Sequence, residues 1–191
     1  MKEFFNEIEN KIQHALTTEI KRILKETGEE KIYAAALVTD SDCITLFLAV
    51  NTYEYMQKRD REYIEILHLP EEQAKKIREG TSSVVKWIPD EWGYSDGENS
   101  ELTEISKLLF AKEESNPDEY SQHIDLFIEK VISAFKQVIE SNIFGENSEE
   151  ISFFISMSDD ERIYEIEDHS AKVLNSEKVY EDFLKRHETG A

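Results

Sequence analysis

The spacing of apolar residues changes along the chain, and this change restricts the fold more than any other feature of the sequence. The first segment has apolar residues at steps of three and four, as on one face of an α-helix: Phe4, Phe5, Ile8, Ile12, Leu16, Ile20, Ile23 and Leu24. Gly28 follows as a stop signal. Two β-branched and aromatic runs, 32–39 and 43–50, come next, with Asp40-Ser41-Asp42 between them. The pattern predicts a long helix followed by a β-hairpin.

Helix signals dominate the remainder of the chain. Capping residues, first-turn acids and apolar periodicity predict helices over about 53–66, 70–79, 102–110, 117–139, 158–174 and 176–184. In the third of these we expect Leu102, Ile105, Leu108 and Leu109 to face inward. Short apolar runs at 82–88 and 151–157 predict a third and a fourth strand. This order predicts an α+β fold, with a small, mostly antiparallel sheet of about four strands packed by several long helices, and a single domain over 1–191.

The chain is strongly acidic, with 22 Lys and Arg against 42 Asp and Glu and a net charge of −20. Such a field repels phosphate backbones and anionic lipids, so nucleic acids and membranes are poor partners and a basic protein is a good one. Solubility alone is the alternative role of this acidity. Cys43 is the only cysteine, so no internal disulfide can form. With no apolar run as long as a signal or membrane segment, these features predict a cytoplasmic protein.

The two tryptophans of the chain lie in one run, Trp87-Ile88-Pro89-Asp90-Glu91-Trp92. Residues 90–119, which include the end of this run, hold ten acids against two lysines. Aromatic anchors beside steering acids are typical of an interface for a basic partner. We assign structural roles to Trp87, facing inward, and to Pro89, as the end of the third strand. The predicted protein-binding residues are Glu91, Trp92, Tyr94, Asp96, Glu98 and Glu101, with Trp92 facing outward. A solvated loop with two core tryptophans is the alternative.

Residues 93–97 form a G-x-S-x-G motif around Ser95, which would be the nucleophile of a small serine hydrolase. A nucleophile elbow needs a strand that ends at the first glycine and a helix that begins directly after the serine. Intervening segments on both sides of the motif conflict with this geometry, although His123, His169 and His187 downstream could supply a base. We predict no catalytic residue and keep the hydrolase as an alternative.

Metal and cofactor patterns are absent from the sequence. The five histidines form no ligand spacing, and the paired acids at Asp40 and Asp42 are explained by a turn. Cys43 begins an apolar run, where a thiol is expected to be a buried, inert apolar side chain. No glycine-rich phosphate loop occurs. We therefore predict neither a metal nor a cofactor.

Three segments resemble a known family. Tyr33-Ala34-Ala35-Ala36-Leu37-Val38-Thr39-Asp40, the helix start at Asn51-Thr52, and Lys86 to Tyr94 with its Trp-x-Pro-x-Glu-Trp motif are similar to a bacterial family of uncharacterised cytoplasmic proteins, domain of unknown function 4303. The resemblance spans most of the chain and brings no catalytic residues. The long helical insert around 56–80 is expected to depart from the family pattern. In size and gene setting the members resemble proteins found near bacterial toxin systems, which implies an immunity role.

Together, the acidic composition and the resemblance favour a non-enzymatic binding protein. The leading hypothesis is an immunity-type inhibitor that neutralises a toxin, such as a basic nuclease, through an acidic and aromatic surface. An oligomeric scaffold is a further alternative that the sequence does not separate from a binding role.

Overall fold

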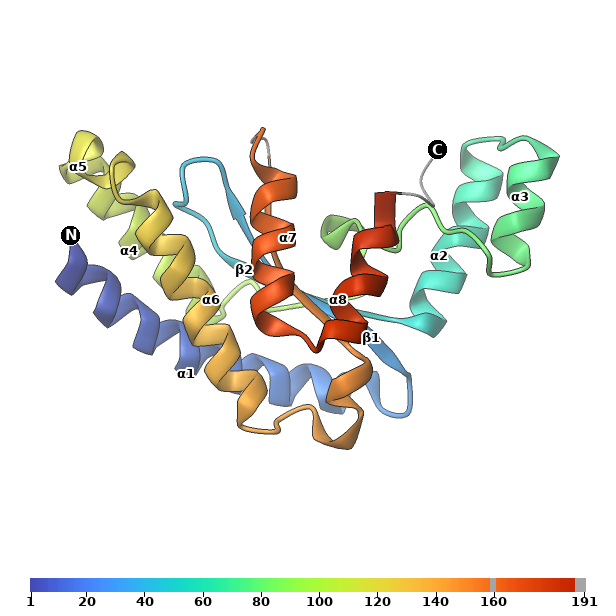
Figure 1. Ribbon diagram of the computed structural model, residues 1–191, viewed down its shortest axis with the longest axis horizontal. Helices are drawn as coiled ribbons and strands as arrows, with labels where there is room; N and C mark the ends of the chain where they lie inside the picture. The colour runs from blue at the N-terminus through green and yellow to red at the C-terminus, as the bar shows by residue number, and fades with distance from the viewer. Residues whose placement is uncertain (159–160, 188–191) are drawn as a thin grey trace.

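The computed structural model describes residues 1–158 and 161–187 and confirms the α+β class (Figure 1). The α-helices are α1 (Lys2–Thr27), α2 (Tyr53–Ile66), α3 (Glu71–Arg78), α4 (Glu101–Ser115), α5 (Pro117–Ser121), α6 (Ile124–Glu140), α7 (Ile163–Leu174) and α8 (Glu177–Leu184). The strands are β1 (Ile32–Asp40), β2 (Phe47–Thr52), β3 (Tyr94–Ser95) and β4 (Ser152–Ser158). Short 3₁₀ helices cover Pro89–Glu91, Gly145–Glu150 and Lys185–His187.

The four strands form one mixed sheet in the order β3-β2-β1-β4. β2 pairs antiparallel with both β1 and β3, as the hairpin signature predicted for the first pair. β1 and β4 pair in parallel, from Ala34 opposite Ser152 to Asp40 opposite Ser158. Parallel neighbours need a long connection, and helices α2 to α6 lie between these two strands in the chain. The sheet is therefore mixed, with antiparallel pairing at two of its three junctions.

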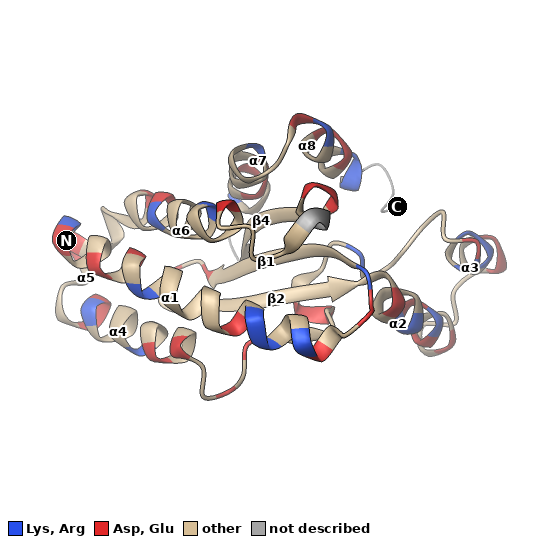
Figure 2. Cartoon of the chain, turned by 90° about the horizontal axis from the view of Figure 1, so that it is seen from below, with Lys and Arg blue, Asp and Glu red and all other residues tan. Residues whose placement is uncertain are grey.

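The central strand β1 supplies side chains to two separate cores. Successive side chains of a strand point to opposite faces, and here Ala35 and Leu37 join the core beneath α1 and α6. Ala34, Ala36 and Val38 join a second core on the other face, with aromatic side chains from several elements. In Figure 2 the strands are nearly free of charged residues, which lie along the helices. The sheet is thus enclosed on both faces, and the acidic composition belongs to the helical surface.

The outer edge of β4 is covered by side chains of α7 and the residue after it. Asn175 accepts a hydrogen bond from the Phe153 amide at 2.8 Å and donates one to the Phe153 carbonyl at 2.7 Å. The Ser170 hydroxyl accepts from the Ile155 amide at 2.9 Å. An open strand edge would be a template for pairing with another chain. These side chains take the place of a neighbouring strand.

The prediction of a third strand at 82–88 is wrong. This segment forms turns and bends, and the short β3 lies further along the chain. Side chains satisfy its backbone amides instead of a strand partner. The Asp60 carboxylate accepts from the Val84 amide at 2.9 Å and from the Ser83 hydroxyl at 3.0 Å. Ser83 in turn accepts from the amides of Val85 and Lys86. Local hydrogen bonds of this kind compete with sheet formation.

The second strand begins at Phe47 rather than at Cys43. Asp40 accounts for this later start, because its carboxylate accepts hydrogen bonds from the Ile44 amide and the Thr45 hydroxyl, both at 2.9 Å. Within this turn Cys43 has a φ of 56°, a left-handed conformation that a strand does not allow. Asp40 therefore lengthens the hairpin connection that was expected to span three residues.

Two helix predictions are also changed. The helix predicted over 117–139 is divided into α5 and α6, because the chain leaves helical geometry around His123. The capping box predicted at 158–161 includes Asp159 and Asp160, which lie outside the described residues. α7 begins at Ile163, later than predicted, and ends at Leu174, as expected. Leu108 was predicted to face inward, but it is 43% exposed. The apolar face of α4 therefore extends beyond the part of the helix that packs into the core.

Candidate protein-binding surface

Trp92 is buried, so its predicted outward orientation is wrong. It is 8% exposed, and its indole nitrogen donates to the Val85 carbonyl at 3.2 Å. The ring lies edge-on to Phe154, with ring centroids 5.8 Å apart. Its place in the second core depends on small neighbours, because Ala34 and Ala36 leave space for an indole on that face of the sheet. Trp92 is a core residue rather than an anchor for a partner.

Trp87 is only partly buried, although the sequence assigned it the inward role. One side of its ring packs edge-on against Phe183 at a centroid distance of 5.3 Å, and the Lys86 ammonium lies 5.0 Å from its centroid. Pro89 is buried and begins the 3₁₀ helix Pro89–Glu91 instead of ending a strand. The fixed φ of proline suits the first position of a helical turn. Of the two tryptophans, Trp87 is therefore the one that reaches the surface.

Glu91 makes contacts within the chain. Its carboxylate accepts from the Arg59 guanidinium at 3.0 Å, which joins the 3₁₀ helix to α2. Hydrogen bonds from Tyr63 and Arg59 lower the pKa of Glu91. Because its charge is already matched by Arg59, Glu91 has little left to offer a partner.

Tyr94 and Asp96 hold β3 in place. The Tyr94 hydroxyl donates to the Glu30 carboxylate at 2.8 Å. Asp96 accepts from the Leu48 amide at 2.7 Å and from the Ser100 hydroxyl. Burial raises the pKa of Asp96, opposed by these hydrogen bonds. Both residues thus secure the sheet edge that precedes α4.

Ser95 does not occupy a nucleophile elbow. It lies in the edge strand β3, its carbonyl accepts from Arg22 at 2.5 Å, and α4 begins only at Glu101. Two of the three histidines considered as bases are engaged elsewhere: His123 contacts the Glu119 carbonyl and His169 contacts Glu129, while the side chain of His187 lies outside the described part of the chain. Among the described side chains, Ser95, His123 and His169 are not brought together into a catalytic site.

Cys43 is fully buried in the first core, where its carbonyl accepts from the Tyr120 hydroxyl at 2.6 Å. Its position agrees with the predicted apolar role, while its reactivity stays a prediction. Within residues 1–158 and 161–187, no three His, Cys, Asp or Glu side chains are grouped in a way that could hold a metal ion.

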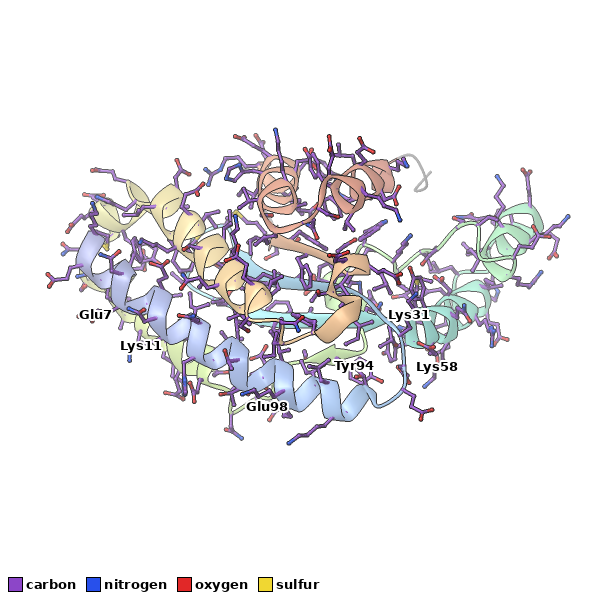
Figure 3. All side chains as sticks on the ribbon, turned by 60° about the horizontal axis from the view of Figure 1, so that its bottom comes forward. Glu7, Lys11, Lys31, Lys58, Tyr94 and Glu98 are labelled. Carbon is purple, nitrogen blue, oxygen red and sulfur yellow. The ribbon has the colours of Figure 1, made fainter. Side chains whose placement is uncertain are left out.

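Glu98 and Glu101 are the two predicted binding residues that are exposed. Glu98 lies in the turn before α4, and Ser100 caps the helix by accepting from the Thr103 amide at 3.1 Å. This cap fixes Glu101 and Glu104 in the first turn, where the helix dipole favours acids. In Figure 3 the labelled side chains of Lys11 and Glu98 lie on the α1 side of the molecule.

Glu101 belongs to a surface groove of about 380 Å³ between α1 and α4. We call it the α1–α4 groove. Its lining residues are Asn10, Lys11, His14, Glu101, Glu104, Ile105 and Leu108. Ile105 and Leu108 form an apolar floor, and the carboxylates of Glu101 and Glu104 stand at its α4 side. His14 lies 3.6 Å from Glu101 across the groove.

Sequence reasoning found Glu101 and missed the other residues of the groove. Leu108 was assigned to the core because its spacing matches that of Leu102 and Ile105. Only the contact of α4 with α1, two helices about ninety residues apart, turns these positions into one surface. The signal that could have pointed to it is the recurrence of acidic and apolar residues at 101, 104, 105 and 108 on one helical face.

One known protein family matches most of the chain. Residues 12–176 match the family described as Domain of unknown function (DUF4303). The chain belongs to this family. The match includes the Trp-x-Pro-x-Glu-Trp segment and all residues that line the α1–α4 groove except Asn10 and Lys11. No curated protein and no solved structure matches this DUF4303 chain. In the described part of the chain, none of the helices has the length and apolar character that crossing a membrane requires.

Proposed function

We propose that this DUF4303 protein is a non-enzymatic binding protein that recognises a basic protein partner. The observation that carries the proposal is the α1–α4 groove, in which the exposed side chain of Leu108 lies beside carboxylates. Leu108 is 43% exposed in a helix whose neighbouring apolar residues, Ile105 and Leu109, are buried. An exposed apolar side chain within a polar rim is a common feature of interaction sites.

The chemistry of the groove suits a lysine or arginine side chain of the partner. Such side chains place their methylene stems on apolar surface while the charged end reaches polar groups. Here the stem would lie on Leu108, and the charged end would meet Glu101 and Glu104, replacing their exposed ion pairs with His14 and Lys107. The net charge of −20 would speed the encounter with a basic protein at low ionic strength.

We further propose that the partner is a toxin, for example a basic nuclease, and that binding neutralises it in the cytoplasm. The support is the gene setting of the family that the Trp-x-Pro-x-Glu-Trp segment resembles, together with the acidic charge. An inhibitor of this kind needs an accessible recognition surface and no catalytic residue of its own.

Co-expression with the product of the adjacent gene tests this function. The proposal predicts that the two proteins co-purify and that this protein restores growth of cells producing the neighbouring product. Absence of both a complex and growth rescue would remove the proposal. Light scattering on the same sample tests the scaffold alternative, which requires a stable oligomer of this chain alone.

A matched pair of variants on one helix tests the surface itself. Glu101→Gln with Glu104→Gln removes two charges from the groove, whereas Glu113→Gln with Glu114→Gln removes two charges from the last turn of α4. Both pairs change the net charge equally. If the groove binds the partner, the first pair weakens the complex much more than the second; equal effects would indicate general attraction by net charge.

A further inference from the structure

A second hollow lies between β1, the segment after α3 and α8, far from the α1–α4 groove in sequence. It has a volume of about 310 Å³, which is in the range of small-molecule sites. Figure 1 shows α8 beside the chain that follows α3. We call this hollow the Lys86 pocket. The residues that line it include Tyr33, Tyr53, Lys86, Trp87, Glu150 and Asp182.

Three aromatic rings form the apolar part of the Lys86 pocket. Tyr33 and Tyr53 have ring centroids 4.9 Å apart, and Trp87 stands edge-on to Tyr33 at 6.2 Å. The Tyr33 hydroxyl is fixed, because it donates to the Lys86 carbonyl at 2.8 Å and accepts from Asn51 at 3.0 Å. Tyr53 is 37% exposed and Trp87 is partly buried, so both rings have surface that a ligand can contact.

The acids of the Lys86 pocket are matched to cations other than Lys86. Glu150 pairs with Lys31 at 2.8 Å, and Asp182 pairs with Lys185 at 2.7 Å. Among the described residues, no carboxylate forms a salt bridge with Lys86. In a chain with 42 acids, a half-buried lysine without a paired acid is unusual.

The partly buried ammonium of Lys86 would be stabilised by a negatively charged partner. Burial lowers the pKa of Lys86, partly opposed by the more distant charge of Asp182. Its ammonium contacts the face of Trp87, an interaction much weaker than a hydrogen-bonded carboxylate or phosphate would give in the same place. An anionic group would supply both the missing charge and the hydrogen-bond acceptors.

We propose that the Lys86 pocket binds a small aromatic anion, with its carboxylate or phosphate on the Lys86 ammonium and its ring against Trp87 and Tyr53. This site is independent of the proposed basic partner, because it has the opposite charge preference and lies on other elements. The two possible sources of the negative group, a phosphate monoester and a carboxylate, are distinguished by the choice of probe.

Nuclear magnetic resonance of the two indole N–H groups provides the test. The probes are adenosine 5′-monophosphate and 4-hydroxybenzoate, with adenosine and 4-hydroxybenzyl alcohol as their neutral counterparts. We expect at least one anion to shift the Trp87 signal at millimolar concentration, while the Trp92 signal, buried and bonded to Val85, changes little. Trp87→Phe assigns the signals. No shift with either anion, or equal shifts with the neutral probes, would overturn the proposal.

Variants of Lys86 complete the test. Lys86→Met should weaken binding of the anion at least tenfold, and Lys86→Arg should retain most of it. Lys58→Met, which removes an exposed lysine of α2, should leave the affinity unchanged. Unchanged binding in Lys86→Met would contradict the assignment. If that variant does not fold, the comparison of anionic with neutral probes on the unaltered protein still decides the outcome.

Discussion

The α1–α4 groove and the Lys86 pocket show opposite ways of making a surface that can bind. The groove lies where two helices leave part of an apolar face uncovered, and its acids project from exposed helical positions. The Lys86 pocket is lined by rings that also belong to or contact the second core, such as Tyr33 and Trp87. Changes in the groove should therefore affect binding alone, whereas changes around the pocket should affect stability as well.

The largest effect is expected for Trp92, whose buried ring lies edge-on to Tyr33 of the Lys86 pocket at a centroid distance of 6.3 Å. Trp92→Ala should lower the free energy of unfolding by about 3 to 5 kcal/mol, because it leaves a cavity in the second core and removes the indole hydrogen bond to the Val85 carbonyl. Trp87→Ala should cost clearly less, since part of that ring is already exposed. Urea denaturation measures both values. A larger loss for Trp87 would reverse the assignment of the two tryptophans.

Gly93→Ala should have the next largest effect, at about 1 to 3 kcal/mol. A Cβ atom at this position would lie 2.5 Å from the Tyr55 ring, so this ring or the backbone that carries it must shift. Gly97→Ala is the matched control, because open space surrounds that position. Thermal unfolding of the two variants should differ by several degrees. Equal midpoints would indicate that the contact of Tyr55 with Gly93 does not restrain the segment.

A pH series tests the buried carboxyl that shapes the segment beside the Lys86 pocket. Burial raises the pKa of Asp60 above its ordinary value of 3.8. The native state then holds a proton that the unfolded chain releases, so stability falls as the pH rises from about 3.8 through the native pKa. Asp60→Asn should make this decline shallower in urea midpoints measured across the window.

Glu91→Gln provides a control of opposite sign. The pKa of Glu91 is lowered from 4.5 by hydrogen bonds from Tyr63 and Arg59, so its contribution is present above about pH 4.5 and is lost as the pH falls through the native pKa. Removing this carboxylate should reduce the loss of stability in acid and leave the decline due to Asp60 unchanged. Parallel changes in the two variants would contradict these assignments.

The smallest effect on stability is expected in the α1–α4 groove. Glu101→Gln with Glu104→Gln breaks only exposed ion pairs, with His14 and Lys107, and should change the free energy of unfolding by less than about 1 kcal/mol. Leu108→Ala should also be mild because this side chain is 43% exposed. A loss of several kcal/mol in either variant would place the groove among the structural regions and remove the contrast with the pocket.

Local sequence signals predicted those elements whose ends are determined by nearby residues. The bounds of α2 agree with the structure because the Thr52 hydroxyl caps it by accepting from the Tyr55 amide at 3.1 Å. The run at 82–88 was misassigned because the acceptor that shapes it, Asp60, lies more than twenty residues earlier in the chain. Apolar composition alone does not distinguish a strand from a segment whose amides are satisfied by side chains.

The binding surface was less predictable than the fold because it depends on contacts between distant segments. The burial of Trp92 follows from the alanines of β1, whose small size matters only once the two segments are brought together. Glu101 was identified from charge, but its partner residues in α1 were not. The motif around Trp92 is therefore a feature of the core, and the exposed surface lies on the helix that follows it.

The most direct test of the central claim is the dissociation constant of the complex with the adjacent-gene product, compared between Leu108→Ala and Phe110→Ala. Both side chains are exposed on α4, at 43% and 47%, but only Leu108 lines the groove. We predict a loss of affinity of about tenfold, equivalent to about 1.4 kcal/mol, for Leu108→Ala and almost none for Phe110→Ala. Equal affinities in the two variants would show that the partner does not bind in the α1–α4 groove.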